Sequence, residues 1–98
     1  MDWDTLVNEV TTRHPEIRRA KMFGMPCLKR ETGKVIAGHW KDGGMNVKLI
    51  DEAQRTAALA LPGAELFDPG MGRVMKEWVL VPKVQSDRWL ELVEQAIG

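Results

Sequence analysis

The chain has 98 residues, which is enough for one domain and too few for two. Fourteen lysines and arginines balance fourteen aspartates and glutamates, and a net charge of zero argues against a dedicated nucleic-acid binder. Cys27 is the only cysteine, so no disulfide can form within the chain. The apolar runs are too short to cross a membrane, and the N-terminus lacks the pattern of a signal peptide. We therefore expect a single cytoplasmic domain over residues 1–98.

The first half of the chain is predicted to form one helix and four strands. Trp3, Leu6 and Val10 recur at helical spacing behind a potential cap at Asp2, and proline follows at position 15. The period then changes to two, with turns rich in glycine between the strands, which makes these strands antiparallel neighbours. Pro26 indicates that the second strand begins at an edge or a bulge. The four expected strands cover residues 19–23, 25–30, 35–41 and 45–50.

The second half is predicted to form a helix, two strands and a final helix. Asp51 is placed to cap a helix that ends before Pro62, and short strands follow at residues 64–67 and 74–81. Ser86 is the expected N-cap of the last helix, which has a clear apolar stripe. The order α-β-β-β-β-α-β-β-α predicts a two-layer α+β fold, in which an antiparallel sheet carries its helices on one face.

Two segments resemble the TfoX N-terminal domain family. The first is Lys21-Met22-Phe23-Gly24 with the hairpin strand that begins at Gly33, and the second is Leu66-Phe67-Asp68-Pro69-Gly70 with the strand that ends at Val81-Pro82. The resemblance covers nearly the whole chain and implies a two-layer α+β fold. The chain departs from the family pattern at Met25-Pro26-Cys27, where a glycine often follows Gly24. The family brings no catalytic residues, and the role of a full competence regulator cannot be carried over, because its C-terminal domain is lacking here.

The residues that could carry chemistry are few. Cys27 and His39 could approach each other across a hairpin, but their register can also place them on opposite faces. One cysteine and two histidines are too few for a zinc site without carboxylates at a suitable spacing, so we expect neither a metal nor a cofactor. A ligand pocket that uses Arg73, Glu77 and Cys27 is the third reading of the sequence. The alternative for Glu77, and the default, is a structural ion pair with Arg73 or with a lysine on a neighbouring strand.

Charge is distributed unevenly along the chain. Residues 1–50 carry nine basic and six acidic side chains (9 − 6 = +3), whereas residues 51–98 carry five and eight (5 − 8 = −3). If neighbouring strands bring the basic side chains together, they form a patch for the phosphates of nucleic acid; otherwise they are a solvated sheet face that opposes aggregation. The residues of this alternative are Arg18, Arg19, Lys21, Lys29 and Arg30.

Three of the four tryptophans are expected in the core, namely Trp3, Trp78 and Trp89. Trp40 precedes a turn, is the most exposed by prediction, and is a natural anchor for a partner. The leading hypothesis is therefore a non-enzymatic interaction or regulatory domain that forms a homodimer or binds a protein partner. Weak nucleic-acid binding and a ligand pocket or small enzyme are the alternatives.

Overall fold

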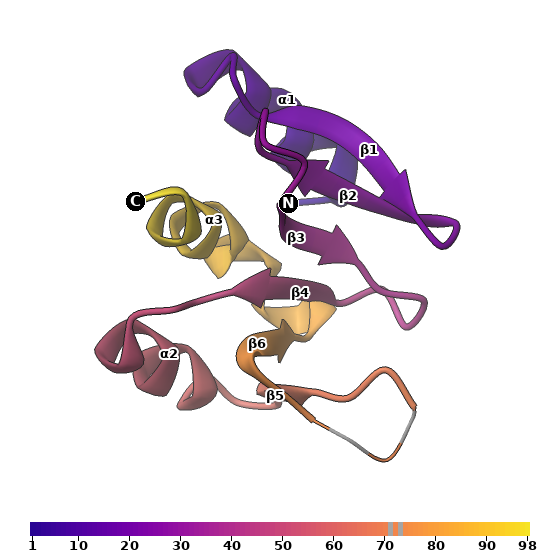
Figure 1. The fold of residues 1–98 in the computed structure, drawn as a ribbon. Coiled ribbons are helices and arrows are strands. Elements are labelled where there is room, and N and C mark those ends of the chain that lie inside the picture. The colour runs from indigo at the N-terminus through magenta and orange to yellow at the C-terminus, as the bar shows by residue number, and fades with distance from the viewer. Residues whose placement is uncertain (71, 73) are drawn as a thin grey trace.

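A six-stranded antiparallel sheet, with strand order β1-β2-β3-β4-β6-β5, forms the centre of the computed structural model (Figure 1). The structure describes residues 1–70, 72 and 74–98. The helices pack on one face of the sheet, so both the predicted element order and the predicted two-layer arrangement are confirmed. The elements are α1 (Trp3–Arg13), β1 (Arg18–Met22), β2 (Met25–Lys29), β3 (Val35–His39), β4 (Met45–Lys48), α2 (Glu52–Leu59), β5 (Glu65–Phe67), β6 (Met75–Val81), the 3₁₀ helix η1 (Lys83–Arg88) and α3 (Trp89–Ile97).

The main core lies between the sheet and its helices. One row of directly opposed side chains crosses four strands, and every member of the row is fully buried. Apolar side chains of α1 and α3 cover this row and belong to the same cluster. Because side chains alternate along a strand, the register of this row decides which residues lie on the helix side. The row consists of Leu28, Ala37, Val47 and Val79.

The N-cap predictions are right for two helices and wrong for the third. The carboxylates of Asp2 and Asp51 accept hydrogen bonds from the backbone N–H groups of Thr5 and Gln54, and the bond from Thr5 lowers the pKa of Asp2. Ser86 caps nothing. It lies inside η1, and α3 continues from that 3₁₀ turn without a free N-terminus to cap.

The first strand ends one residue before the predicted boundary. Phe23 has φ +52°, which is the left-handed region, so it belongs to the turn and not to β1. A second correction concerns Trp78, which is half-buried and lies outside the core cluster. Its partner across the sheet is Lys48, and by strand alternation both lie on the face without helices.

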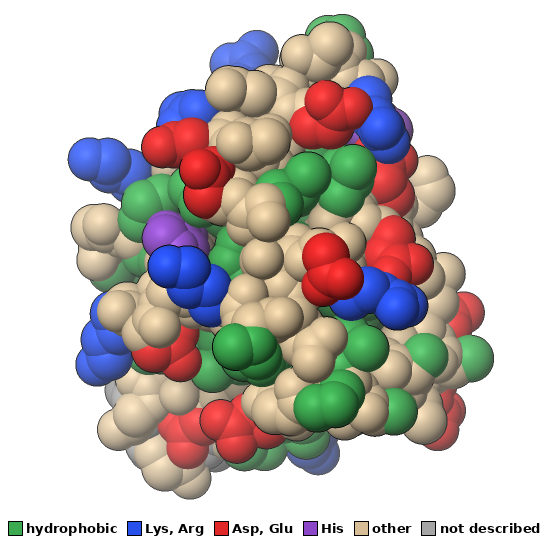
Figure 2. Space-filling model, turned by 180° about the vertical axis from the view of Figure 1, so that it is seen from behind, with side chains coloured by type: hydrophobic (Ala, Val, Ile, Leu, Met, Phe, Trp, Pro, Cys, Tyr) green, Lys and Arg blue, Asp and Glu red, His purple; other side chains and the backbone are tan. Residues whose placement is uncertain are grey.

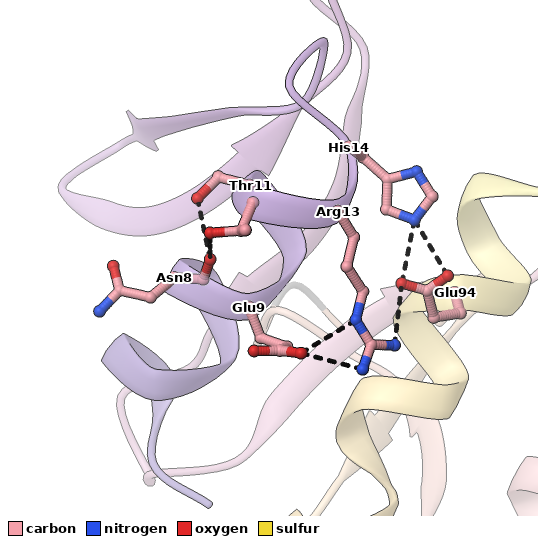
Figure 3. A network of polar contacts seen from close by, with 7 residues as sticks. Asn8, Glu9, Thr11, Arg13, His14 and Glu94 are labelled. Atoms are coloured by element: carbon pink, nitrogen blue, oxygen red, sulfur yellow. Dashed lines mark hydrogen bonds and ion pairs between the residues drawn. The ribbon is translucent and has the colours of Figure 1, made fainter.

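A polar contact joins α1 to α3 at one end of the molecule (Figure 3). The Nε2 atom of His14 lies 2.9 Å from a carboxylate oxygen of Glu94, and Arg13 reaches the same carboxylate at 4.0 Å. Arg13 also pairs with Glu9 on its own helix at 2.9 Å. These contacts hold together the two helices that cover the sheet. None of the helices formed by the described residues is both long enough and apolar enough to span a membrane.

Replacing a member of the buried row should destabilise the fold strongly. Leu28→Ala should lower the free energy of unfolding by about 3 kcal/mol, because the deletion leaves a cavity under α1 and α3. The matched change Val84→Ala, at a side chain that is 83% exposed, should change it by less than about 0.5 kcal/mol. Urea denaturation followed by circular dichroism measures both values, and equal losses would contradict this core.

Candidate functional site

The face of the sheet without helices carries a second, smaller layer of side chains, and we call it the open face. A row of opposed residues crosses it from β2 to β6: Cys27, Gly38, Asn46 and Leu80. Cys27 and Phe67 are buried but do not belong to the main core cluster. Figure 1 views the sheet from this side, with α1 and α3 behind it.

Aromatic and methionine side chains fill part of the open face. The ring of Trp40 meets that of Phe67 edge-on, with a centroid distance of 4.7 Å, so side chains from β5 and from the β3–β4 turn meet. The sulfur of Met25 lies 3.7 Å from the amide nitrogen of Asn46. A Cβ atom on Gly38 would lie within 2.7 Å of the side chains of both Met25 and Asn46, so a larger residue here would require these side chains to shift. The Oδ1 atom of Asn46 is buried without a hydrogen-bond partner among the described residues.

Cys27 and His39 lie on opposite faces of the sheet and cannot act as a pair. Cys27 is opposite Gly38 on the open face, whereas His39 points to the helix side. There its ring stacks on Trp3 at 5.4 Å and meets the edge of Trp89 at 6.4 Å. Among the described residues, no three histidine, cysteine or acidic side chains are grouped so as to hold a metal ion.

Cys27 and Glu77, two of the three residues of the predicted ligand pocket, do not converge. Cys27 lies on β2, and Glu77 lies on β6 as an exposed side chain that alternates away from the open face. Arg73, and with it the predicted pairing of Arg73 with Glu77, lies outside the described residues. Hence Cys27 and Glu77, the two described members of the predicted pocket, do not form a common site.

The five basic residues proposed for nucleic-acid binding are divided between three places. Arg19 and Lys21 lie on the helix side, where Arg19 pairs with Asp4 at 3.0 Å. Arg30 donates to the carbonyl groups of Ala96 and Ile97 at the end of α3, at 3.0 and 2.9 Å. The two that face each other on the open face are Arg18 and Lys29.

Phe23, the predicted end of the first strand, lies in the β1–β2 turn. Phe23 and Gly24 are its two central residues, with φ +52° and +78°, as in a two-residue hairpin of type I′. Such turns favour asparagine or aspartate before glycine, and a bulky residue in this conformation is strained. The Phe23 side chain is also 100% exposed. The sequence feature that could have revealed this turn is the Phe23-Gly24 pair, which separates two segments of strand-like alternation by two residues.

A groove opens beside this turn, at the end of the sheet where the β1–β2 turn, the β3–β4 turn and the loop after β5 lie together (Figure 1). Its volume is about 470 Å³. The residues that shape it are Phe23, Met25, Pro26, Trp40, Lys41 and Pro69, with His39 beneath them. We call this the tip groove.

Pro26 explains why the groove exists. The β2–β3 pairing ends at Cys27 and Gly38, so Pro26 would face His39 if the register continued. Met22 and Met25 close the two-residue hairpin, and Pro26 is the next residue along β2. At this position the backbone nitrogen points away from β1 and toward β3. Proline has no N–H to donate, and the two strands part at this point. Pro26 therefore lies in an interior strand, opposite Lys21 of β1, at a place where that strand is unpaired on its β3 side.

Three comparisons with known proteins gave no match: no family model, no curated protein and no solved structure corresponds to this chain. The functional conclusion accordingly depends on the geometry of the open face and the tip groove.

The thiol of Cys27 should be inert in the folded protein. Burial raises its pKa, although the charge of Lys29 opposes this shift, and the thiolate is the reactive form. Native protein at neutral pH should react with iodoacetamide far more slowly than protein unfolded in guanidinium chloride, as measured by mass spectrometry. Equal rates would show that the open face does not shield Cys27.

Proposed function

We propose that this chain is a non-enzymatic interaction domain that binds a protein partner through the tip groove. The observation that supports the proposal is Phe23, which combines a strained left-handed backbone with a fully exposed aromatic ring. Neither feature stabilises the folded chain. Strain and exposure at the same residue are characteristic of binding sites, where the partner provides the missing contacts.

The chemistry of the groove defines the partner. Its walls are aromatic, proline and methionine side chains, which suit one apolar side chain of an extended segment. Lys41 provides the one formal charge among the described lining residues and lies 5.3 Å from the Trp40 ring centroid. Within the described chain Lys41 has no ion-pair partner. The fitting partner is therefore a peptide segment with an apolar side chain beside a carboxylate.

Self-association is the less favoured use of the exposed surface. The edge strand β1 carries Arg18, Arg19 and Lys21, and these like charges oppose pairing with a second β1. The other edge strand, β5, has three residues, which is too short for an extended pairing. The TfoX-type relationship remains part of this proposal, and its landmark residues Met22-Phe23-Gly24 form the turn beside the groove.

Phe23→Asn should stabilise the folded protein. Asparagine tolerates the left-handed region, and the fully exposed ring loses no burial when it is removed, so the free energy of unfolding should rise by about 1 kcal/mol. Thermal and urea unfolding measure the change. A loss of stability would show that Phe23 has a structural role, and would remove the main support for the proposal.

The binding experiment uses a labelled peptide with one tryptophan flanked by glutamates, and a matched peptide with lysines in their place. The acidic peptide should shift the amide resonances of Phe23, Gly24 and Trp40 saturably, and more strongly than the basic one, because Lys41 is the charged group at the rim. Phe23→Asn should abolish these shifts, whereas Ile50→Asn, at an equally apolar exposed position at the other end of the strands, should not.

Shifts spread over other surfaces, or equal responses to both peptides, would contradict the proposed site. Light scattering at the same concentrations provides a further control, since a dimer that Phe23→Asn dissociates would make a second copy the occupant of the groove and overturn the proposal of a peptide partner.

A further inference from the structure

The ion pairs among the described residues all lie on the helix side of the molecule. Each of them involves α1 with its C-cap His14, η1 or α3. Figure 2 shows the molecule from the helix side, where acidic and basic side chains lie close together. The open face differs, because its basic residues have no such partners.

Three of these basic residues form a line across the sheet, at the end of the strands opposite the tip groove. Arg18 and Lys29 are directly opposed on β1 and β2, and Lys48 lies on β4. Strand alternation places all three on the open face, and the effect of Lys29 on the pKa of Cys27 agrees with this placement. We call these three residues the basic stripe. None of them forms an ion pair with any residue that the structure describes.

The basic stripe continues into a shallow pocket at the end of the strands, beside the β2–β3 turn and the end of α3. Lys48, Arg30 and Lys34 line this pocket, whose volume is about 310 Å³, and no acidic residue is among its lining residues. The two hydrogen bonds from Arg30 to the end of α3 use one guanidinium nitrogen and hold the group in place. Its other N–H groups can still donate to an anion. Glu31 lies in the adjoining turn, so the charge balance here is positive but not free of carboxylates.

An aromatic ring lies at the end of the basic stripe. Trp78 on β6 is directly opposite Lys48 and half-buried, so part of its ring faces solvent on the open face. From β1 to β6 there are four steps between strands, which is about 19 Å. Cations in a line beside an exposed aromatic ring are what proteins use to bind single-stranded nucleic acid, by phosphate contacts and base stacking.

We propose that the open face binds single-stranded nucleic acid, with phosphates on Arg18, Lys29 and Lys48 and a base stacked on Trp78. This activity is separate from peptide binding in the tip groove and does not depend on it. The same placement excludes Arg19 and Lys21, which the sequence grouped with Arg18, because they lie on the helix side. Two charges adjacent in sequence therefore have different predicted roles.

The experiment measures fluorescence anisotropy of a labelled single-stranded oligothymidylate at several salt concentrations. Three phosphate contacts predict a slope of log K against log salt of about −2. Arg18→Glu/Lys29→Glu should reduce this slope to about −0.7, whereas Arg19→Glu/Lys21→Glu, which makes the same change in net charge, should leave it near −2. Lys83→Glu/Arg88→Glu is a second control with the same charge change, placed in η1. Trp78→Leu should weaken binding about fivefold to a hundredfold.

Circular dichroism establishes that each variant is folded before its binding is compared. Absence of binding by the wild-type chain at low salt would overturn the proposal. Equal losses of affinity in Arg18→Glu/Lys29→Glu and in Arg19→Glu/Lys21→Glu would also overturn it. Duplex DNA or polyglutamate that competes as well as unlabelled oligothymidylate would also overturn it, because neither presents a free base to Trp78. A variant with Phe23→Asn should bind the oligonucleotide normally, which separates this site from the tip groove.

Discussion

The strand register on the helix side is the constraint on which the rest of the structure depends. Leu28, Ala37 and Val47 must lie on the helix side to pack against α1 and α3, and a slip of one residue would move every one of them to the open face. The same alternation places Lys29, Asn46 and Trp78 on the open face. The composition of the open face is thus a consequence of the core as well as a surface in its own right.

The two ends of the strands have different chemistry. At one end, the missing N–H of Pro26 and the left-handed backbone of Phe23 interrupt regular pairing and produce an apolar groove. At the other end, the β2–β3 ladder shifts register between Leu28 and Lys29, but the β1–β2 and β4–β6 ladders stay in register and carry the basic stripe. A short domain with one core can therefore present two separate surfaces, since neither requires a change in the packed layer between sheet and helices.

Much of the fold could be predicted from sequence, because apolar periodicity and tight turns are local signals. The composition of the two faces of the sheet could not be predicted in the same way. Arg18 and Arg19 are neighbours in sequence yet lie on opposite faces, and only the pairing of β1 with β2 decides which is which. Phe23 has the propensity of a strand residue, but the two-residue turn overrides it. Ser86 has the propensity of an N-cap, but a 3₁₀ turn continues directly into α3 and leaves nothing to cap.

The open face must be free of any further covering layer if the basic stripe and Trp78 are to meet a ligand. Hydroxyl-radical footprinting of the folded chain compares all four tryptophans in one measurement. Trp40 and Trp78 should be oxidised, whereas Trp3 and Trp89, which are 5% and 1% exposed, should be protected. Protection of Trp78 equal to that of Trp89 would mean that another surface covers this face, and would contradict the two-layer account.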